Sequence, residues 1–155
     1  MTAGPIERHW PKQWADEELT LQLEFLTFLR ITAVNKIAEL DPALAAAAPI
    51  KTSPVMTLLG VIKHLTAVER EWFTRVGGGS DLPSLWEDDP EFDWRIRPED
   101  TPASVVAAYR EEWANAEAAL AGKTADDRAV VTVNGRDRTV CWLLSWPMGP
   151  AANNP

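Results

Sequence analysis

Few side chains in this sequence are suited to metal binding or nucleophilic chemistry. The chain has two histidines, His9 and His64, and one cysteine, Cys141. His64 falls on the flank of a segment with helical apolar spacing, and Gly60 lies one turn earlier on the same side, which leaves space beside the imidazole. A lone histidine on a helix flank is more often a half-exposed residue than a ligand, so its position alone assigns it no function. His9 lies in an N-terminal arm, where a surface position is the simpler interpretation.

Cys141 and a group of acidic residues are weaker candidates. Cys141 lies inside an apolar run, so we expect a small buried side chain rather than a reactive thiol. A single cysteine cannot form an internal disulfide, which fits a reducing compartment. The acidic residues between 88 and 93 lack the spacing of a calcium-binding loop, and they predict a solvated acidic loop. Those residues are Asp88, Asp89, Glu91 and Asp93.

Charge and motifs exclude several classes of function. The formal net charge is -8, from 23 acidic and 15 basic residues, which disfavours binding to nucleic acid or to an anionic membrane. No apolar run approaches the roughly 20 residues that cross a bilayer, so we predict a cytoplasmic protein. The sequence also lacks a phosphate-binding loop, a dinucleotide fingerprint and a Gly-x-Ser-x-Gly nucleophile motif.

Apolar periodicity predicts three long amphipathic helices that would position these side chains. The spacings of three, four and seven residues fall within 16–40, 54–76 and 102–120. The first range ends at Asp41-Pro42 because proline disfavours helical geometry in the preceding residue. The second ends at Gly77, the first of three glycines that can adopt a left-handed conformation. The sequence therefore predicts a mostly α-helical protein.

Two charged residues lie within the apolar faces of these helices. Arg30 falls inside the apolar arc of the first helix, and Glu69 fills the one polar position in the stripe of the second. Two buried opposite charges are each costly alone and tolerable together. We therefore predict an interhelical Arg30–Glu69 ion pair with an architectural role. The alternative is that both side chains extend to the edge of the core.

The segments between and after the long helices have distinct predicted forms. Residues 80–100 are acidic and rich in proline, with Trp86 and Trp94 expected to hold an ordered loop against the helices. Residues 129–140 alternate around Asn134-Gly135 and predict a small β-hairpin. A shortened fourth helix then follows over 140–146.

These elements make one domain with short extensions, since 155 residues are too few for two comfortable domains. We expect an N-terminal arm at 1–15, a helical bundle at 16–146 and a disordered tail at 147–155.

Several runs of residues resemble segments of the DinB-like family, and most closely its actinobacterial-type branch related to mycothiol-dependent enzymes. The run 53–73, with His64 in the triplet Lys63-His64-Leu65, looks like the second helix of that family. The other matching segments are Leu85-Trp86-Glu87-Asp88-Asp89-Pro90, Tyr109-Arg110-Glu111-Glu112 and 138–144. The resemblance, in the order and spacing of these segments, spans most of the chain, from Asp16 to Ser145.

This resemblance implies a four-helix bundle in up-down-down-up order, often dimeric, with zinc or nickel in a cleft. Relatives include S-transferases that use the thiols mycothiol or bacillithiol, maleylpyruvate isomerases and metal-dependent hydrolases. The family's metal is held by a histidine of the second helix, which corresponds to His64, and by two ligands, usually histidines, from the fourth. Such three-ligand sites leave open positions where a metal can deprotonate a thiol or water.

The sequence departs from this pattern after Leu144. It reads Ser145-Trp146-Pro147-Met148-Gly149-Pro150, and no histidine follows His64, so we expect an incomplete metal site produced by truncation or by a change of reading frame. Two functions stay open: a metal-dependent thiol S-transferase or hydrolase, and a non-catalytic helical domain that binds a partner or small ligand.

A short fourth helix would also leave an apolar groove, which predicts a homodimer with Trp142, Leu143 and Trp146 as anchors; marginal stability of the monomer is the alternative.

Overall fold

The computed structural model describes residues 5–12 and 16–145, and these residues form helices joined by loops. The predicted all-α class is confirmed. The elements are α1 (Glu18–Asn35), α2 (Pro42–Ala46), α3 (Leu58–Glu69), a π-helix η1 (Arg70–Gly77), α4 (Pro102–Leu120) and α5 (Val140–Ser145). Within the described ranges, no helix has the length and apolar character needed to cross a membrane.

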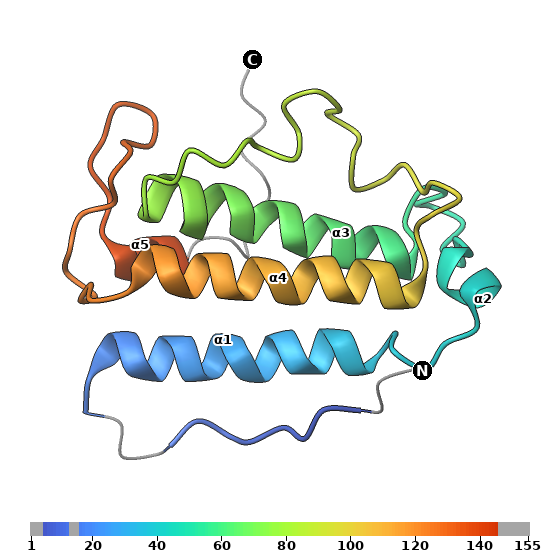
Figure 1. Ribbon diagram of the computed structural model, residues 1–155, viewed down its shortest axis with the longest axis horizontal. Coiled ribbons are helices and arrows are strands. Elements are labelled where there is room, and N and C mark those ends of the chain that lie inside the picture. Colours follow the sequence, from blue (N-terminus) through green and yellow to red (C-terminus); the bar gives the residue numbers. More distant parts are fainter. Residues whose placement is uncertain (1–4, 13–15, 146–155) are drawn as a thin grey trace.

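The three long helices lie roughly parallel to one axis (Figure 1). Following the colours along the chain, α3 and α4 run in the same direction, and α1 runs opposite to both. This is the order of directions expected for the first three helices of an up-down-down-up bundle. The fourth, α5, begins at Val140 as predicted, and Ser145 is the last described residue. Trp146 and the predicted tail 147–155 lie outside the described residues.

Two apolar clusters hold α1 against the other helices, one near each end of α1. The cluster near its carboxyl end joins α1 and the following turn to α2, α3 and α4, and contains Val34, Ile37, Ala45, Leu59, Ile62, Val105 and Tyr109. The cluster near its amino end joins α1 to η1, α4 and α5, and contains Leu19, Phe73, Ala116, Leu120, Ala125 and Val140. The middle of α1 therefore lies between two separate packed regions.

Two helix ends differ from the prediction, and the start of α4 agrees with it. Helix α1 ends at Asn35 rather than Leu40, although Ile37 still packs into the core at 1 % exposure. Apolar spacing continues through this turn, so periodicity alone could not locate the end of the helix. Helix α3 begins at Leu58 because the Thr57 side chain accepts a hydrogen bond from the Gly60 amide at 2.9 Å. The start of α4 is as predicted, since Thr101 caps it and Pro102 opens it.

The last two turns of the predicted second helix are a π-helix. From Arg70 to Gly77 the backbone is wider than an α-helix, and the Gly78 amide bonds to the carbonyl of Phe73 at 3.0 Å. Side chains of η1 converge on Glu112 of α4: Arg70 Nε donates at 2.7 Å and Thr74 Oγ1 donates at 2.5 Å. These bonds attach η1 to α4.

The predicted β-hairpin is only partly formed. Asn134 and Gly135 have φ of 52° and 69°, the left-handed pair that a tight hairpin turn requires. Within residues 5–12 and 16–145, however, this segment makes isolated bridges and no continuous strand. The amides of Val130 and Val131 instead bond to the carbonyls of Gly77 and Val76, at 3.3 Å and 3.1 Å. Two backbone amides that a longer β-ladder would have used are thus hydrogen-bonded to carbonyls at the end of η1.

The predicted Arg30–Glu69 ion pair is confirmed and connects the middle of α1 to the end of α3. Arg30 Nε lies 3.1 Å from each carboxylate oxygen of Glu69, and both residues are 3 % exposed. Tyr109 of α4 donates its hydroxyl to Glu69 at 2.7 Å. Burial, followed by the charge of Glu69 and this hydrogen bond, raises the pKa of Tyr109 well above its ordinary value. The pair therefore joins three helices between the two apolar clusters.

Candidate functional site

His64 of α3 makes a short hydrogen bond to a buried carboxylate. Its Nδ1 lies 2.7 Å from Oδ2 of Asp93, which belongs to the long segment between η1 and α4. The His64 side chain is 36 % exposed, whereas the Asp93 side chain is 3 % exposed. No hydrogen-bond partner for Nε2 occurs among residues 5–12 and 16–145. One ring nitrogen is thus committed to the protein and the other is available.

Gly60 makes room for this contact, as its position one turn before His64 predicted. A Cβ atom at Gly60 would lie 2.9 Å from the backbone oxygen of Asp93 and 3.5 Å from the indole of Trp94. Any larger residue would push the loop away from α3. The absent side chain therefore lets Asp93 approach the imidazole.

Two indoles flank the imidazole. Trp94 stacks on His64 with ring centroids 5.3 Å apart and an interplanar angle of 23°. Trp86 lies at 6.1 Å with a tilt of 52°. The prediction that these tryptophans hold the loop on the helices is borne out, and their contact is with the imidazole itself. Rings packed against His64 limit the rotation of its side chain.

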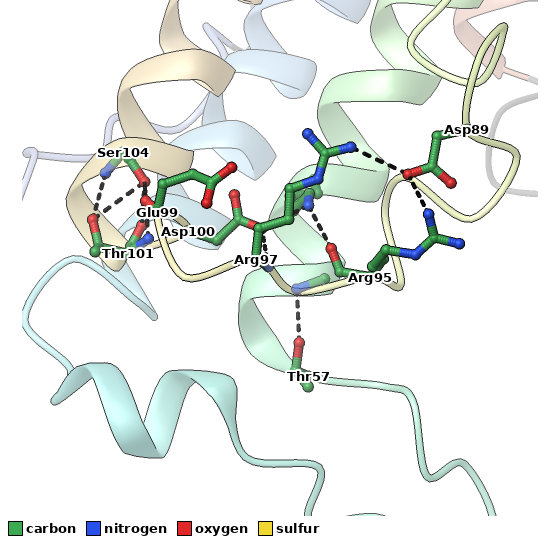
Figure 2. Close-up of polar contacts among 10 residues, drawn as sticks. Thr57, Asp89, Arg95, Arg97, Glu99, Asp100, Thr101 and Ser104 are labelled. Carbon is green, nitrogen blue, oxygen red and sulfur yellow. Dashed lines mark hydrogen bonds and ion pairs between the residues drawn. The ribbon is translucent and has the colours of Figure 1, made fainter.

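Charged contacts hold the loop that carries Asp93 (Figure 2). Lys63, next to His64 in α3, donates Nζ to the Arg95 carbonyl and to Asp100 Oδ2, both at 2.8 Å. Asp89 accepts from Arg95 at 3.1 Å and from Arg97 at 3.2 Å. The Lys63 bonds attach the loop to α3 on the carboxyl side of Asp93, and the Asp89 bonds connect parts of the loop to each other. Together they hold the carboxylate in place beside His64.

The prediction of a solvated acidic loop was wrong for Asp93. Asp88 and Glu91 are exposed, but Asp93 is 2 % exposed and faces α3. Charge patterning treats neighbouring acids alike, whereas tertiary packing turns this one inward. The only sequence signal was its position immediately before Trp94, a residue already expected to pack against the helices.

The described residues do not provide a three-ligand metal site. Among them, no group of three or more histidine, cysteine, aspartate or glutamate side chains could hold an ion. His9 is exposed and lies 4.0 Å from Glu7, and Glu71, which shares the flank of His64, pairs with Arg75 at 3.1 Å. Residues 1–4, 13–15 and 146–155 contain no side chain of these four types.

The donor set near His64 therefore does not fit a tightly held zinc or nickel ion. Asp93 Oδ2 is already bonded to Nδ1, which leaves Nε2 as the single nitrogen donor. Affinity for these metals depends on the number and preset geometry of the ligands.

Cys141 is placed outside this site. Its Sγ donates to Glu18 Oε1 at 3.0 Å and accepts from Gln22 Nε2 at 3.3 Å, both residues of α1. The thiol is half-buried rather than fully buried as predicted. These contacts attach α5 to α1, which is a structural role.

Comparison with known proteins places the chain in a family. Residues 21–148 match the family model described as mycothiol S-transferase, a DinB-like family, so the resemblance found in the sequence is confirmed. No curated protein and no solved structure matched the chain.

Proposed function

Because the chain belongs to the mycothiol S-transferase family, we propose that it transfers a small thiol of the mycothiol type to an electrophilic substrate at His64. The family match is the observation that carries the activity. The open Nε2 of a half-exposed imidazole supports the location.

The chemistry required of His64 is the removal of a proton from the thiol. Nε2 accepts the S–H proton, and the resulting thiolate attacks the electrophilic carbon of the second substrate. The new C–S bond forms as the leaving group departs with its bonding electron pair. The proton on the imidazole then passes to the leaving group or to water, which returns His64 to its starting state. An imidazole suits this step because its ordinary pKa lies near neutral pH.

We propose further that this reaction does not depend on a stoichiometric metal. The family resemblance predicts zinc or nickel at His64, and the proposal departs from that expectation because the donor set is incomplete. With one nitrogen donor such an ion would be bound weakly and would exchange with solvent. The incomplete donor set, rather than the family assignment, supports this part of the proposal.

The test is a thiol-transfer assay on the purified chain without a histidine tag, using mycothiol and an aryl chloride such as chlorodinitrobenzene as probe. We expect conjugation above the uncatalysed rate, unchanged by a chelator, and a loss of about 100-fold in His64→Ala. His9→Ala is the matched control and should keep the wild-type rate, because the His9 side chain is 77 % exposed and its acidic neighbour is Glu7 rather than Asp93.

Three results would separate the alternatives. Activity that appears only with added zinc and depends on His64 would contradict the metal-free part. Equal rates in wild type and His64→Ala would contradict the location. No transfer with or without metal would favour a non-catalytic domain, which the single nitrogen donor also allows.

A further inference from the structure

We infer that Asp93 is a positioning residue that fixes which ring nitrogen of His64 carries hydrogen and so leaves Nε2 as the accepting atom. The inference deepens the proposed function and rests on it for the catalytic consequence. The tautomer itself follows from the contacts of this chain alone.

The burial of Asp93 requires an explanation that packing does not provide. A carboxylate taken out of water is costly unless it is paired or well hydrogen-bonded. Asp93 is 2 % exposed, yet within the described part of the chain its only hydrogen-bond partner is His64. Its second oxygen, Oδ1, is buried without a partner there. By contrast the neighbouring acid Asp89 bonds two arginines. The hydrogen bond to the His64 imidazole therefore accounts for the buried position of Asp93.

The hydrogen bond determines the tautomer. A carboxylate only accepts hydrogen bonds, so the 2.7 Å contact between Nδ1 and Oδ2 assigns the donor role to Nδ1 when Asp93 is a carboxylate. In a neutral imidazole the other nitrogen is then an acceptor. Without the carboxylate, the ring would exchange between both tautomers, and a fraction would present an N–H where the thiol needs a base.

The surroundings prevent the ring from turning over. Trp94 stacks on one face, and Gly60 allows the Asp93 backbone to lie against α3. The loop is attached through Lys63 and Asp100, so the carboxylate cannot easily follow a moved ring. Orientation and tautomer are thus set by the same contacts.

The experiment is nitrogen NMR of the histidine rings in the full chain, combined with steady-state kinetics. The chain has only two histidines, and exposed His9 provides an internal reference for an unconstrained ring. We expect wild-type His64 in the Nδ1–H form, and a mixture in Asp93→Asn, with kcat lowered on the order of 10–100-fold and KM little changed. Asp88→Asn, an exposed residue of the same loop, should change neither measurement.

The two proposals fail in distinguishable ways. Wild-type His64 in the Nε2–H form would overturn the inference whatever the variants do, even if Asp93→Asn does not fold. An unchanged tautomer in a folded Asp93→Asn variant would overturn it as well. If the tautomer depends on Asp93 but the wild type transfers no thiol, the positioning role holds and the proposed function fails.

Discussion

At the scale of single residues, two buried acids serve different purposes. Glu69 accepts hydrogen bonds from Arg30 and Tyr109 and so joins three helices. Asp93, among the described residues, has one side-chain partner and one unsatisfied oxygen. A carboxylate with several donors stabilises the fold, and one with a single imidazole partner orients that imidazole.

Removing the charge of Glu69 should destabilise the protein strongly. Glu69→Gln removes the buried counter-charge of Arg30 and leaves only the exposed carboxylate of Glu117, 3.6 Å from the guanidinium. Breaking a buried pair in this way costs about 3–5 kcal/mol. Urea denaturation followed by circular dichroism measures the loss. Glu111→Gln is the control, because Glu111 is an exposed residue of α4, and the free energy of unfolding of this variant should stay within about 0.5 kcal/mol of wild type. Equal effects of the two substitutions would show that the buried pair is not structural.

Tyr109 makes stability sensitive to alkaline pH. Its pKa in the folded chain lies above the ordinary value of 10.0, so the hydroxyl favours the folded state below pH 10. Above that pH the unfolded chain loses the proton first, and stability should fall as pH rises towards the folded pKa.

The chain has one tyrosine, so tyrosinate absorbance reports Tyr109 alone. We expect no tyrosinate until the protein unfolds, and a smaller alkaline loss of stability in Tyr109→Phe. Reversible ionisation at the ordinary pKa in the folded protein would contradict the buried contact with Glu69.

Sequence reasoning found part of this residue chemistry. Arg30 and Glu69 were predictable because each interrupts an apolar helix face, and Gly60 beside His64 suggested space for a neighbour. Asp93 was not predictable, because it belongs to an irregular loop whose path depends on Lys63, Asp89 and Asp100. Periodicity carries no information about such a path.

At the scale of elements, the junction between α3 and η1 carries two of the contacts that hold the helices together. Glu69 is the last residue of α3, and Arg70 begins the wider turns that bond Glu112. Apolar spacing predicted one continuous helix here because α- and π-turns share similar side-chain patterns over short stretches. The difference arises from contacts with α4. The sequence of this segment alone does not predict those contacts.

Gly78 should be intolerant of any side chain. A Cβ there would meet Ala119 of α4, with the Ala119 Cα 2.9 Å away, and a helix backbone cannot yield as a flexible side chain can. Gly78→Ala should cost about 2 kcal/mol of unfolding free energy, measured by thermal or urea denaturation.

Gly122 provides the matched control for this substitution. Its φ is +75°, and apart from its chain neighbours no described atom lies within 4 Å of the position that a Cβ would take. Gly122→Asn should therefore cost less than Gly78→Ala, because asparagine adopts this left-handed conformation more readily than most residues. A neutral Gly78→Ala would mean that η1 and α4 are not in close contact.

At the scale of the whole molecule, the predicted homodimer needs different anchors. Leu143 is 1 % exposed, and Trp142 packs against Trp72 with ring centroids 6.3 Å apart, so both are used within the chain. Trp146 lies outside the described residues. Large apolar side chains remain exposed elsewhere, including Phe25 at 47 %.

Self-association therefore stays a prediction, and light scattering across a dilution series tests it. We expect the mass of a dimer at high concentration, falling towards that of a 17.2 kDa monomer on dilution. A monomer with unchanged helical content at every concentration would contradict the prediction.

The central claim, that a small thiol meets the protein at His64, is tested most directly by titrating mycothiol into the wild-type chain and following both histidine rings by NMR. We predict that the His64 ring signals shift and saturate while those of His9 stay unchanged. Signals of His64 that do not move at any thiol concentration, or that move only as much as those of His9, would contradict it.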